Sequence, residues 1–144
     1  MTREVEAFNE AWENLFRATR RRRARHEAVD DGPLTVPQYL LLEPLLGGEA
    51  LAVRELAEQA GVQSPTATRM LDGLEQAGFV TRSPSPRDRR MVDVRLTADG
   101  TRVVRARRRQ IEDWRRRLYE ALPEGERADA ARLLRRITEA LEGL

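Results

Sequence analysis

Residues 51–80, LAVRELAEQAGVQSPTATRMLDGLEQAGFV, decide the fold because they contain two short helical patterns joined by a glycine. The first pattern runs from Val53 to Ala60, and Gly61 follows where the chain needs a left-handed turn residue. Two short helices around a tight glycine turn, with small Ala57 at the crossing, predict a helix-turn-helix. The residues that carry this pattern are Leu56, Ala57, Ala60, Gly61, Val62, Ala67 and Met70.

The second helix of this pair is predicted from Pro65 to about Gln76. Ser64 is suited to cap it, and Pro65 suits the first helical position, where a missing N–H costs nothing. Gly78 is placed to close the helix. We expect one face to be buried, with Ala67, Met70, Leu71 and Leu74.

A β-hairpin is predicted directly after the helix-turn-helix, which makes a winged helix. Phe79 to Ser83 read as a strand, SPSPRD as a turn stiffened by its prolines, and Met91 to Leu96 as a second strand. The second strand alternates apolar and polar residues. We therefore expect three side chains to anchor the hairpin on the core, namely Val92, Val94 and Leu96.

Amphipathic helices flank this core on both sides. Upstream, apolar residues from Val5 to Leu15 recur at steps of 3 and 4, and the helix ends by Gly32-Pro33. Thr35 then caps a short helix that Pro44 shortens and Gly47-Gly48 end. Downstream, Thr97 is expected to cap a helix that runs to about Leu122, with an apolar stripe of Val104, Ile111, Trp114 and Leu118. A last helix is expected from Pro123, with an apolar stripe of Ala130, Leu133, Leu134, Ile137, Leu141 and Leu144.

The fold class predicted is mainly α with a small β-hairpin, in the order α-α-α-α-β-β-α-α. We divide the chain into an N-terminal dimerisation helix (1–34), a winged helix-turn-helix core (35–97) and C-terminal dimerisation helices (98–144). The winged helix-turn-helix core can bury its own apolar side chains, whereas the apolar stripes of the terminal helices need a further surface to pack against. A second copy of the chain in an intertwined homodimer supplies it; the alternative is a monomeric helical bundle around the winged helix.

Composition and charge exclude several classes of protein. The 144 residues include no Cys and one His, which excludes disulfides, thiolate metal sites and multi-histidine metal sites. No nucleophile–base pair or phosphate-binding glycine loop is present, so we expect neither an enzyme nor a cofactor. The charged N-terminus and the lack of a long apolar run predict a cytoplasmic protein without a membrane span. Residues 79–117 hold 13 Arg and 5 acidic residues, a charge of +8, which favours a polyanionic partner.

The second helix of the helix-turn-helix carries candidate DNA contacts near its N-terminal end. Small hydroxyls and one Arg in this place suit reading of the major groove, and the exposed N–H groups favour phosphate. Two alternatives stay open: Ser64 as a pure N-cap, and Arg69 in a salt bridge with Asp72 or Glu75. The candidate residues are Gln63, Ser64, Thr66, Thr68 and Arg69.

The tip of the hairpin carries Arg87, Asp88, Arg89 and Arg90. An arginine at such a tip can enter a narrow minor groove, where the potential is most negative. Asp88 repels phosphate, so we interpret it as a carboxylate that orients Arg90 before binding. The alternative is a solvated, mobile tip.

Residues 64–100 resemble the central segment of MarR-type bacterial transcriptional regulators, in the recognition-helix stretch, LEQAGFV, DRR and VRLTADG. The resemblance implies a homodimeric winged helix that binds a pseudo-palindromic double-stranded DNA operator, as a cytoplasmic protein associated with the nucleoid when bound. Asp88 and Arg90 match the family's Asp-x-Arg wing pair, with Arg90 as the minor-groove residue.

The resemblance also implies a small aromatic or phenolic effector that releases the protein from DNA, because many family members respond in this way. Release by cysteine oxidation, which other members use, is excluded by the absence of Cys. Judged by the predicted helices on which they lie, the candidate ligand-binding residues are Trp12, Phe16, Arg17, His26 and Tyr39. For Trp12 and Phe16 the alternative is a place in a hydrophobic core.

The function expected is that of a sequence-specific transcriptional regulator, a repressor released by a ligand. The alternative is a winged-helix module for architecture or protein interaction that binds DNA without sequence preference. Competition between an operator and a scrambled duplex separates the two.

Overall fold

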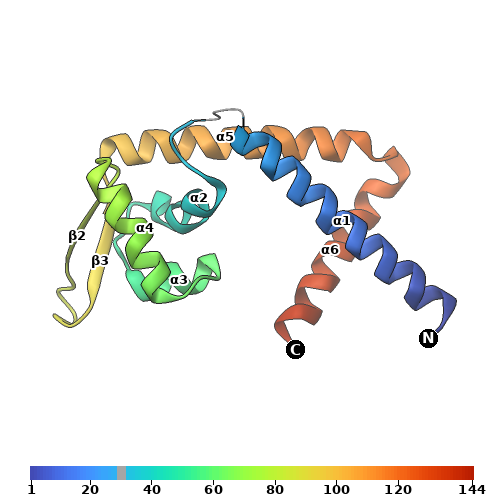
Figure 1. Ribbon diagram of the computed structural model, residues 1–144, viewed down its shortest axis with the longest axis horizontal. Coiled ribbons are helices and arrows are strands. Elements are labelled where there is room, and N and C mark those ends of the chain that lie inside the picture. The colour runs from blue at the N-terminus through green and yellow to red at the C-terminus, as the bar shows by residue number, and fades with distance from the viewer. Residues whose placement is uncertain (29–31) are drawn as a thin grey trace. The chain divides into compact units, whose positions relative to one another are not determined.

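The computed structural model describes residues 1–28 and 32–144, with side chains for 1–25 and 32–144. The chain divides into two compact units, Met1–Val104 and Arg105–Leu144. The first contains the predicted winged helix-turn-helix, which is confirmed (Figure 1). Within the described residues, no helix has the length and apolarity needed to cross a membrane.

Three short α-helices form the helical part of the core: α2 (Val36–Leu42), α3 (Val53–Ala60) and α4 (Ser64–Gln76). Thr35 caps α2 as predicted, since its hydroxyl accepts a hydrogen bond from the Gln38 N–H and the Gln38 side chain accepts one from the Thr35 N–H. The side chains of the first unit that are buried most fully are Leu41, Leu42, Leu56, Leu71, Leu74, Val80, Val94 and Val104.

Pro44 shortens α2 as expected, because proline cannot donate the next helical hydrogen bond. The chain continues as the tighter 3₁₀ helix η1 (Glu43–Gly47), which ends at Gly48 with φ at 85°. Leu41 and Leu45 are buried, whereas Leu40 is 46% exposed and lies outside the core.

The same glycine turn ends both helices of the helix-turn-helix. Gly61 has φ at 68° after α3, and Gly78 has φ at 84° after α4. In each turn the following residue's N–H donates back into the helix, from Val62 to Ala57 and from Phe79 to Leu74, both at 3.0 Å. These are paired Schellman bonds, which need a residue in the left-handed region. Both glycine predictions are confirmed.

The sheet has three antiparallel strands in the order β1-β3-β2. The predicted strands become β2 (Val80–Pro84) and β3 (Val92–Leu96), while β1 (Leu51–Ala52) was not predicted because two residues show no alternation. Val94 is fully buried. The expectation for Val92 is wrong: it pairs with Pro84 near the far end of the hairpin and is 41% exposed.

The wing returns to the core at α5 (Ala98–Ala121), which Thr97 caps as predicted. The Thr97 hydroxyl accepts a hydrogen bond from the Gly100 N–H at 2.9 Å and donates one to the Gly78 carbonyl at 2.6 Å. The Thr97 N–H donates to the Phe79 carbonyl at 3.0 Å. One residue therefore joins the start of α5 to the end of α4.

The terminal helices expose the apolar stripes that the sequence predicts. α1 (Arg3–Ala28) exposes Phe8, Leu15 and Phe16 by 48–55%. In the second unit, α5 continues to Ala121, the 3₁₀ helix η2 spans Glu124–Glu126, and α6 spans Arg127–Glu142. The last helix thus starts later than Pro123, because its first turn is 3₁₀. Its exposed apolar residues include Leu133, Leu134 and Leu141.

Candidate nucleic-acid interface

The N-terminal end of α4 presents polar side chains to solvent. Gln63, and not Ser64, is the N-cap: its carbonyl accepts the Ala67 N–H at 3.0 Å, and no side chain caps the helix. The prediction of Ser64 as the cap is therefore wrong by one residue. Because α4 begins at Ser64, Pro65 is its second residue, still within the first turn. The Ser64 hydroxyl lies instead on the exposed first turn. This leaves it available to a ligand.

The next turn of α4 places Thr68 and Arg69 in solvent and Thr66 half-buried. The Thr68 hydroxyl donates to the Ser64 carbonyl at 3.0 Å. The alternative for Arg69, an ion pair with Asp72 or Glu75, is not formed, because both carboxylates bind Arg82. In the described part of the chain, Arg69 has no ion-pair partner of its own.

The wing tip is built from hydrogen bonds around a buried serine. Ser85 is 6% exposed; its N–H donates to the Met91 carbonyl at 2.8 Å, and its hydroxyl accepts the Arg87 N–H at 3.3 Å. The Met91 N–H donates to the Asp88 carbonyl at 2.9 Å. These bonds hold the loop as a defined turn, whereas the sequence indicated only a stiffened one.

Asp88 and Arg90 form the ion pair that the sequence predicts. The Asp88 carboxylate accepts Arg90 Nε at 3.2 Å and Nη2 at 3.4 Å, and it also accepts the Arg90 backbone N–H at 3.0 Å. The Arg90 side chain is nevertheless 91% exposed. Its guanidinium is thus held by a neighbour while it stays open to solvent. Arg87 and Arg89 are exposed beside it.

The pKa of Asp88 is lowered, first by the Arg90 backbone N–H and then by the Arg90 side chain. Because the pKa in the folded protein lies below the ordinary value of about 3.9, the bonds of the Asp88 carboxylate contribute fully to stability above that pH, and this contribution is lost as the pH falls through the lowered pKa. We expect the ¹³C signal of the Asp88 carboxyl to titrate below the ordinary value. In Arg90→Ala only part of this shift should disappear, because the backbone N–H remains; titration at or above the ordinary value in the wild type would contradict the described turn.

Arg82 is a residue of this region that the sequence prediction missed. It stands on β2, and its guanidinium binds Asp72 and Glu75 of α4. A signal for Arg82 was present in the sequence. Two carboxylates lie three residues apart on the helix, and the arginine follows at an inward position of the next strand.

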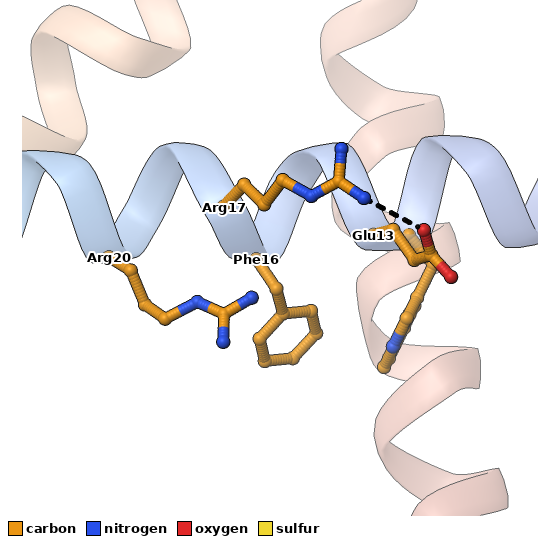
Figure 2. A pocket seen from close by; sticks show the side chains of 5 residues that line it. Glu13, Phe16, Arg17 and Arg20 are labelled. Carbon is orange, nitrogen blue, oxygen red and sulfur yellow. Dashed lines mark hydrogen bonds and ion pairs between the residues drawn. The ribbon is translucent and has the colours of Figure 1, made fainter.

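The candidate ligand-binding residues are only partly brought together. Trp12, Phe16 and Arg17 line a hollow of about 530 Å³ on α1, together with Glu13 and Arg20. Figure 2 shows Arg17 reaching Glu13, at 3.1 Å, and Arg20 extending beside Phe16.

Aromatic contacts continue along α1 on both sides of Trp12, whose ring lies 5.8 Å from that of Phe8 and 5.1 Å from that of Phe16. Tyr39 does not line this hollow: it is 5% exposed in the core of the winged helix, and its assignment to a ligand site stays a prediction. The side chain of His26 lies outside the described residues. Among those that are described, no group of three or more His, Asp or Glu residues could hold a metal ion.

The fold and the exposed arginines of α4 and the wing define the class of winged helix-turn-helix DNA-binding proteins. The sequence model of the MarR family matches residues 34–92. The organic hydroperoxide resistance transcriptional regulator of Bacillus subtilis is 43% identical over 72 residues, 50% of this chain and 49% of that protein. The chain thus matches about half the length of this relative. The transcriptional repressor MdtR of the same organism is 31% identical over 119 residues, 81% of this chain and 75% of that protein.

A solved structure agrees with these sequence matches. The PcaV transcriptional regulator from Streptomyces coelicolor, in complex with its natural ligand, is 25% identical with a TM-score of 0.72, and the match covers 88% of this chain and 90% of that one. The chain belongs to the MarR family. It is a DNA-binding transcriptional regulator and not an enzyme.

Proposed function

We propose that the protein is a homodimeric repressor that binds a pseudo-palindromic operator in the cytoplasm. The first turns of α4 read the major groove through Gln63, Ser64, Thr66, Thr68 and Arg69. The wing enters the adjacent minor groove with Arg90, while Arg87 and Arg89 contact phosphate. This arrangement suits a winged helix, in which the recognition helix and the hairpin address neighbouring grooves.

The observation that carries this proposal is the Asp88–Arg90 pair. A guanidinium that is 91% exposed and yet bonded to a carboxylate two residues away is already oriented before DNA arrives. A mobile basic loop would attract phosphate equally well but would have to be ordered on binding. Preorganisation therefore favours a specific groove contact over a non-specific one. The architectural alternative lacks this support.

Dimerisation is supported by the exposed apolar side chains of the terminal helices. Leu134 is 62% and Leu141 57% exposed on α6, and Phe8 is 55% exposed on α1. Leucines repeated along one face of a helix are unfavourable in water, and a second copy of the chain would cover them.

Release by a small aromatic or phenolic effector is supported by the hollow on α1. Its side chains suit a flat ring with an anionic group: Trp12 and Phe16 offer aromatic surface and Arg20 offers charge, while Arg17 is bonded to Glu13 within the hollow. The PcaV structure holds a natural ligand, and MdtR is named a repressor. Both support a ligand-controlled repressor for this chain.

Replacing Arg90 with alanine tests the proposed operator binding. We expect Arg90→Ala to weaken binding to the operator, selected from fragments of the source genome, by about 1–3 kcal/mol, because the minor-groove contact is lost. Arg109→Ala, which removes an equal charge from an exposed position on α5, should change affinity much less. The measurement is competition between the operator and a scrambled duplex. Equal wild-type affinity for both duplexes would instead support the architectural alternative.

A further inference from the structure

Arg82 joins the wing to the recognition helix through hydrogen bonds to two carboxylates of α4. Its Nη2 donates to Asp72 Oδ1 at 2.6 Å, and its Nε donates to Glu75 Oε2 at 3.1 Å. The Arg82 side chain is only 21% exposed, compared with 91% for Arg90 and 71% for the ion-paired Arg102. We name Arg82, Asp72 and Glu75 the clamp. The guanidinium is thus directed toward α4 and is mostly covered.

The geometry of the clamp restrains both the distance and the rotation of α4 relative to β2. Asp72 and Glu75 are three residues apart and share one face of α4. A planar guanidinium bonded through two nitrogens to two carboxylates fixes its own plane, which a single ammonium cannot do. Both bonds also raise the pKa of Arg82, the Glu75 bond more than the Asp72 bond. The Arg82 guanidinium therefore stays protonated while it is bonded to the two carboxylates.

The clamp lies between the candidate DNA contacts rather than among them. The reading positions of α4 end at Arg69, one turn before Asp72. Arg82 pairs with Val94 within the hairpin, whereas the wing tip lies beyond the Pro84–Val92 pair. A displacement at the clamp would consequently change the spacing between the two groups of contacts.

We propose that Arg82 is a positioning residue for DNA recognition, which locks α4 to β2 so that the recognition helix and the wing reach neighbouring grooves of one operator. The inference rests on the proposed function. Arg82 itself touches no base or phosphate. Its contribution is confined to specific binding, because only a specific complex needs both grooves contacted in a fixed register.

A competing explanation is that Arg82 only neutralises Asp72 and Glu75, whose charges would otherwise repel the operator. The triple variant Arg82→Gln/Asp72→Asn/Glu75→Gln separates the two roles, because it removes the negative charges without rebuilding the charged clamp. If the role is positioning, the triple variant binds the operator as weakly as Arg82→Gln does. If the role is neutralisation, the triple variant binds as the wild type does, and the proposal is overturned.

The experiment measures affinities of the full-length wild type, Arg82→Gln, Arg82→Lys and the triple variant for the operator and for a scrambled duplex, over a range of salt concentrations. We expect Arg82→Gln to lose about tenfold in operator affinity with an unchanged salt slope, while affinity for the scrambled duplex changes little. Arg82→Lys should restore only part of the loss, because an ammonium cannot bond both carboxylates in one plane. Thermal unfolding monitored by circular dichroism checks that each variant is folded.

Besides wild-type binding by the triple variant, two results would overturn the proposal: operator binding by Arg82→Gln equal to that of the wild type, or a salt slope reduced by about one, which would show a direct phosphate contact. Should Arg82→Gln fail to fold, Glu75→Gln alone replaces one of the two ion pairs by a neutral contact and should give a smaller loss of the same kind. Unchanged operator binding by that variant would also count against the clamp. If the wild type does not distinguish the operator from the scrambled duplex, the proposed function fails instead.

Discussion

Replacing Gly100 with alanine is expected to destabilise the protein by about 2–4 kcal/mol, because there is no room for a side chain at this position. A Cβ on Gly100 would overlap the Phe79 carbonyl oxygen and press on the Leu96 side chain. The carbonyl cannot move freely, since it accepts the Thr97 N–H. The segment at Phe79, just before β2, and the first turn of α5 would have to move apart. Urea unfolding of Gly100→Ala, followed by circular dichroism, measures the loss.

Gly73 provides a matched control for this prediction. It lies within α4, is exposed, and has no atom within 4 Å of a Cβ placed on it. Because alanine restricts the unfolded chain and favours helix, Gly73→Ala should stabilise the protein by about 0.5–1 kcal/mol. The two substitutions add the same methyl group and should act in opposite directions. Equal effects would contradict the close approach at Gly100.

Replacing Leu134 with glutamate is expected to convert the proposed dimer to monomers. Leu134 is 62% exposed in the single chain, so the substitution removes little burial within the monomer. In an interface it would place a charge among apolar side chains, which weakens association by about 2–4 kcal/mol. This corresponds to a rise of roughly 30- to 1,000-fold in the dimer dissociation constant. Light scattering at several concentrations measures the change.

Arg136→Glu is the control on the same helix, because residue 136 lies about 200° around α6 from Leu134. It also introduces a negative charge, and it should leave the dimer intact. A wild-type mass of 16.5 kDa at low micromolar concentration would disprove the dimer itself. Operator affinity should fall together with dimerisation in Leu134→Glu, since two linked half-sites bind more tightly than one.

Local chemistry made much of the fold predictable. Gly61, Gly78, Thr35 and Thr97 each act within a few residues of their own position, through a positive φ or a cap, and all four predictions are confirmed. Gly100 could not be identified in the same way, because its constraint comes from Phe79, twenty-one residues earlier in the chain. Constraints between distant segments leave no periodic pattern in a sequence.

In the candidate site, too, contacts between near neighbours in the chain were predicted and contacts between distant segments were not. The Asp88–Arg90 pair spans two residues and was predicted from charge alone, whereas the clamp spans ten residues between Asp72 and Arg82 and was missed. The N-cap of α4 was placed one residue too late, at Ser64 instead of Gln63, because serine followed by proline is a common start of a helix. For Tyr39 the helix was predicted, but the burial of its side chain in the core was not.

The arrangement of α4 has a consequence for how regulators of this kind can diversify. Gln63, Ser64, Thr68 and Arg69 are exposed, whereas Ala67, Leu71 and Leu74 are buried in the core and the Asp72 and Glu75 carboxylates bind Arg82. Mutations at these four exposed positions can therefore accumulate without disturbing the residues that seat the helix. A gene duplicate could acquire a new operator through a few substitutions there and inherit the rest of the scaffold unchanged.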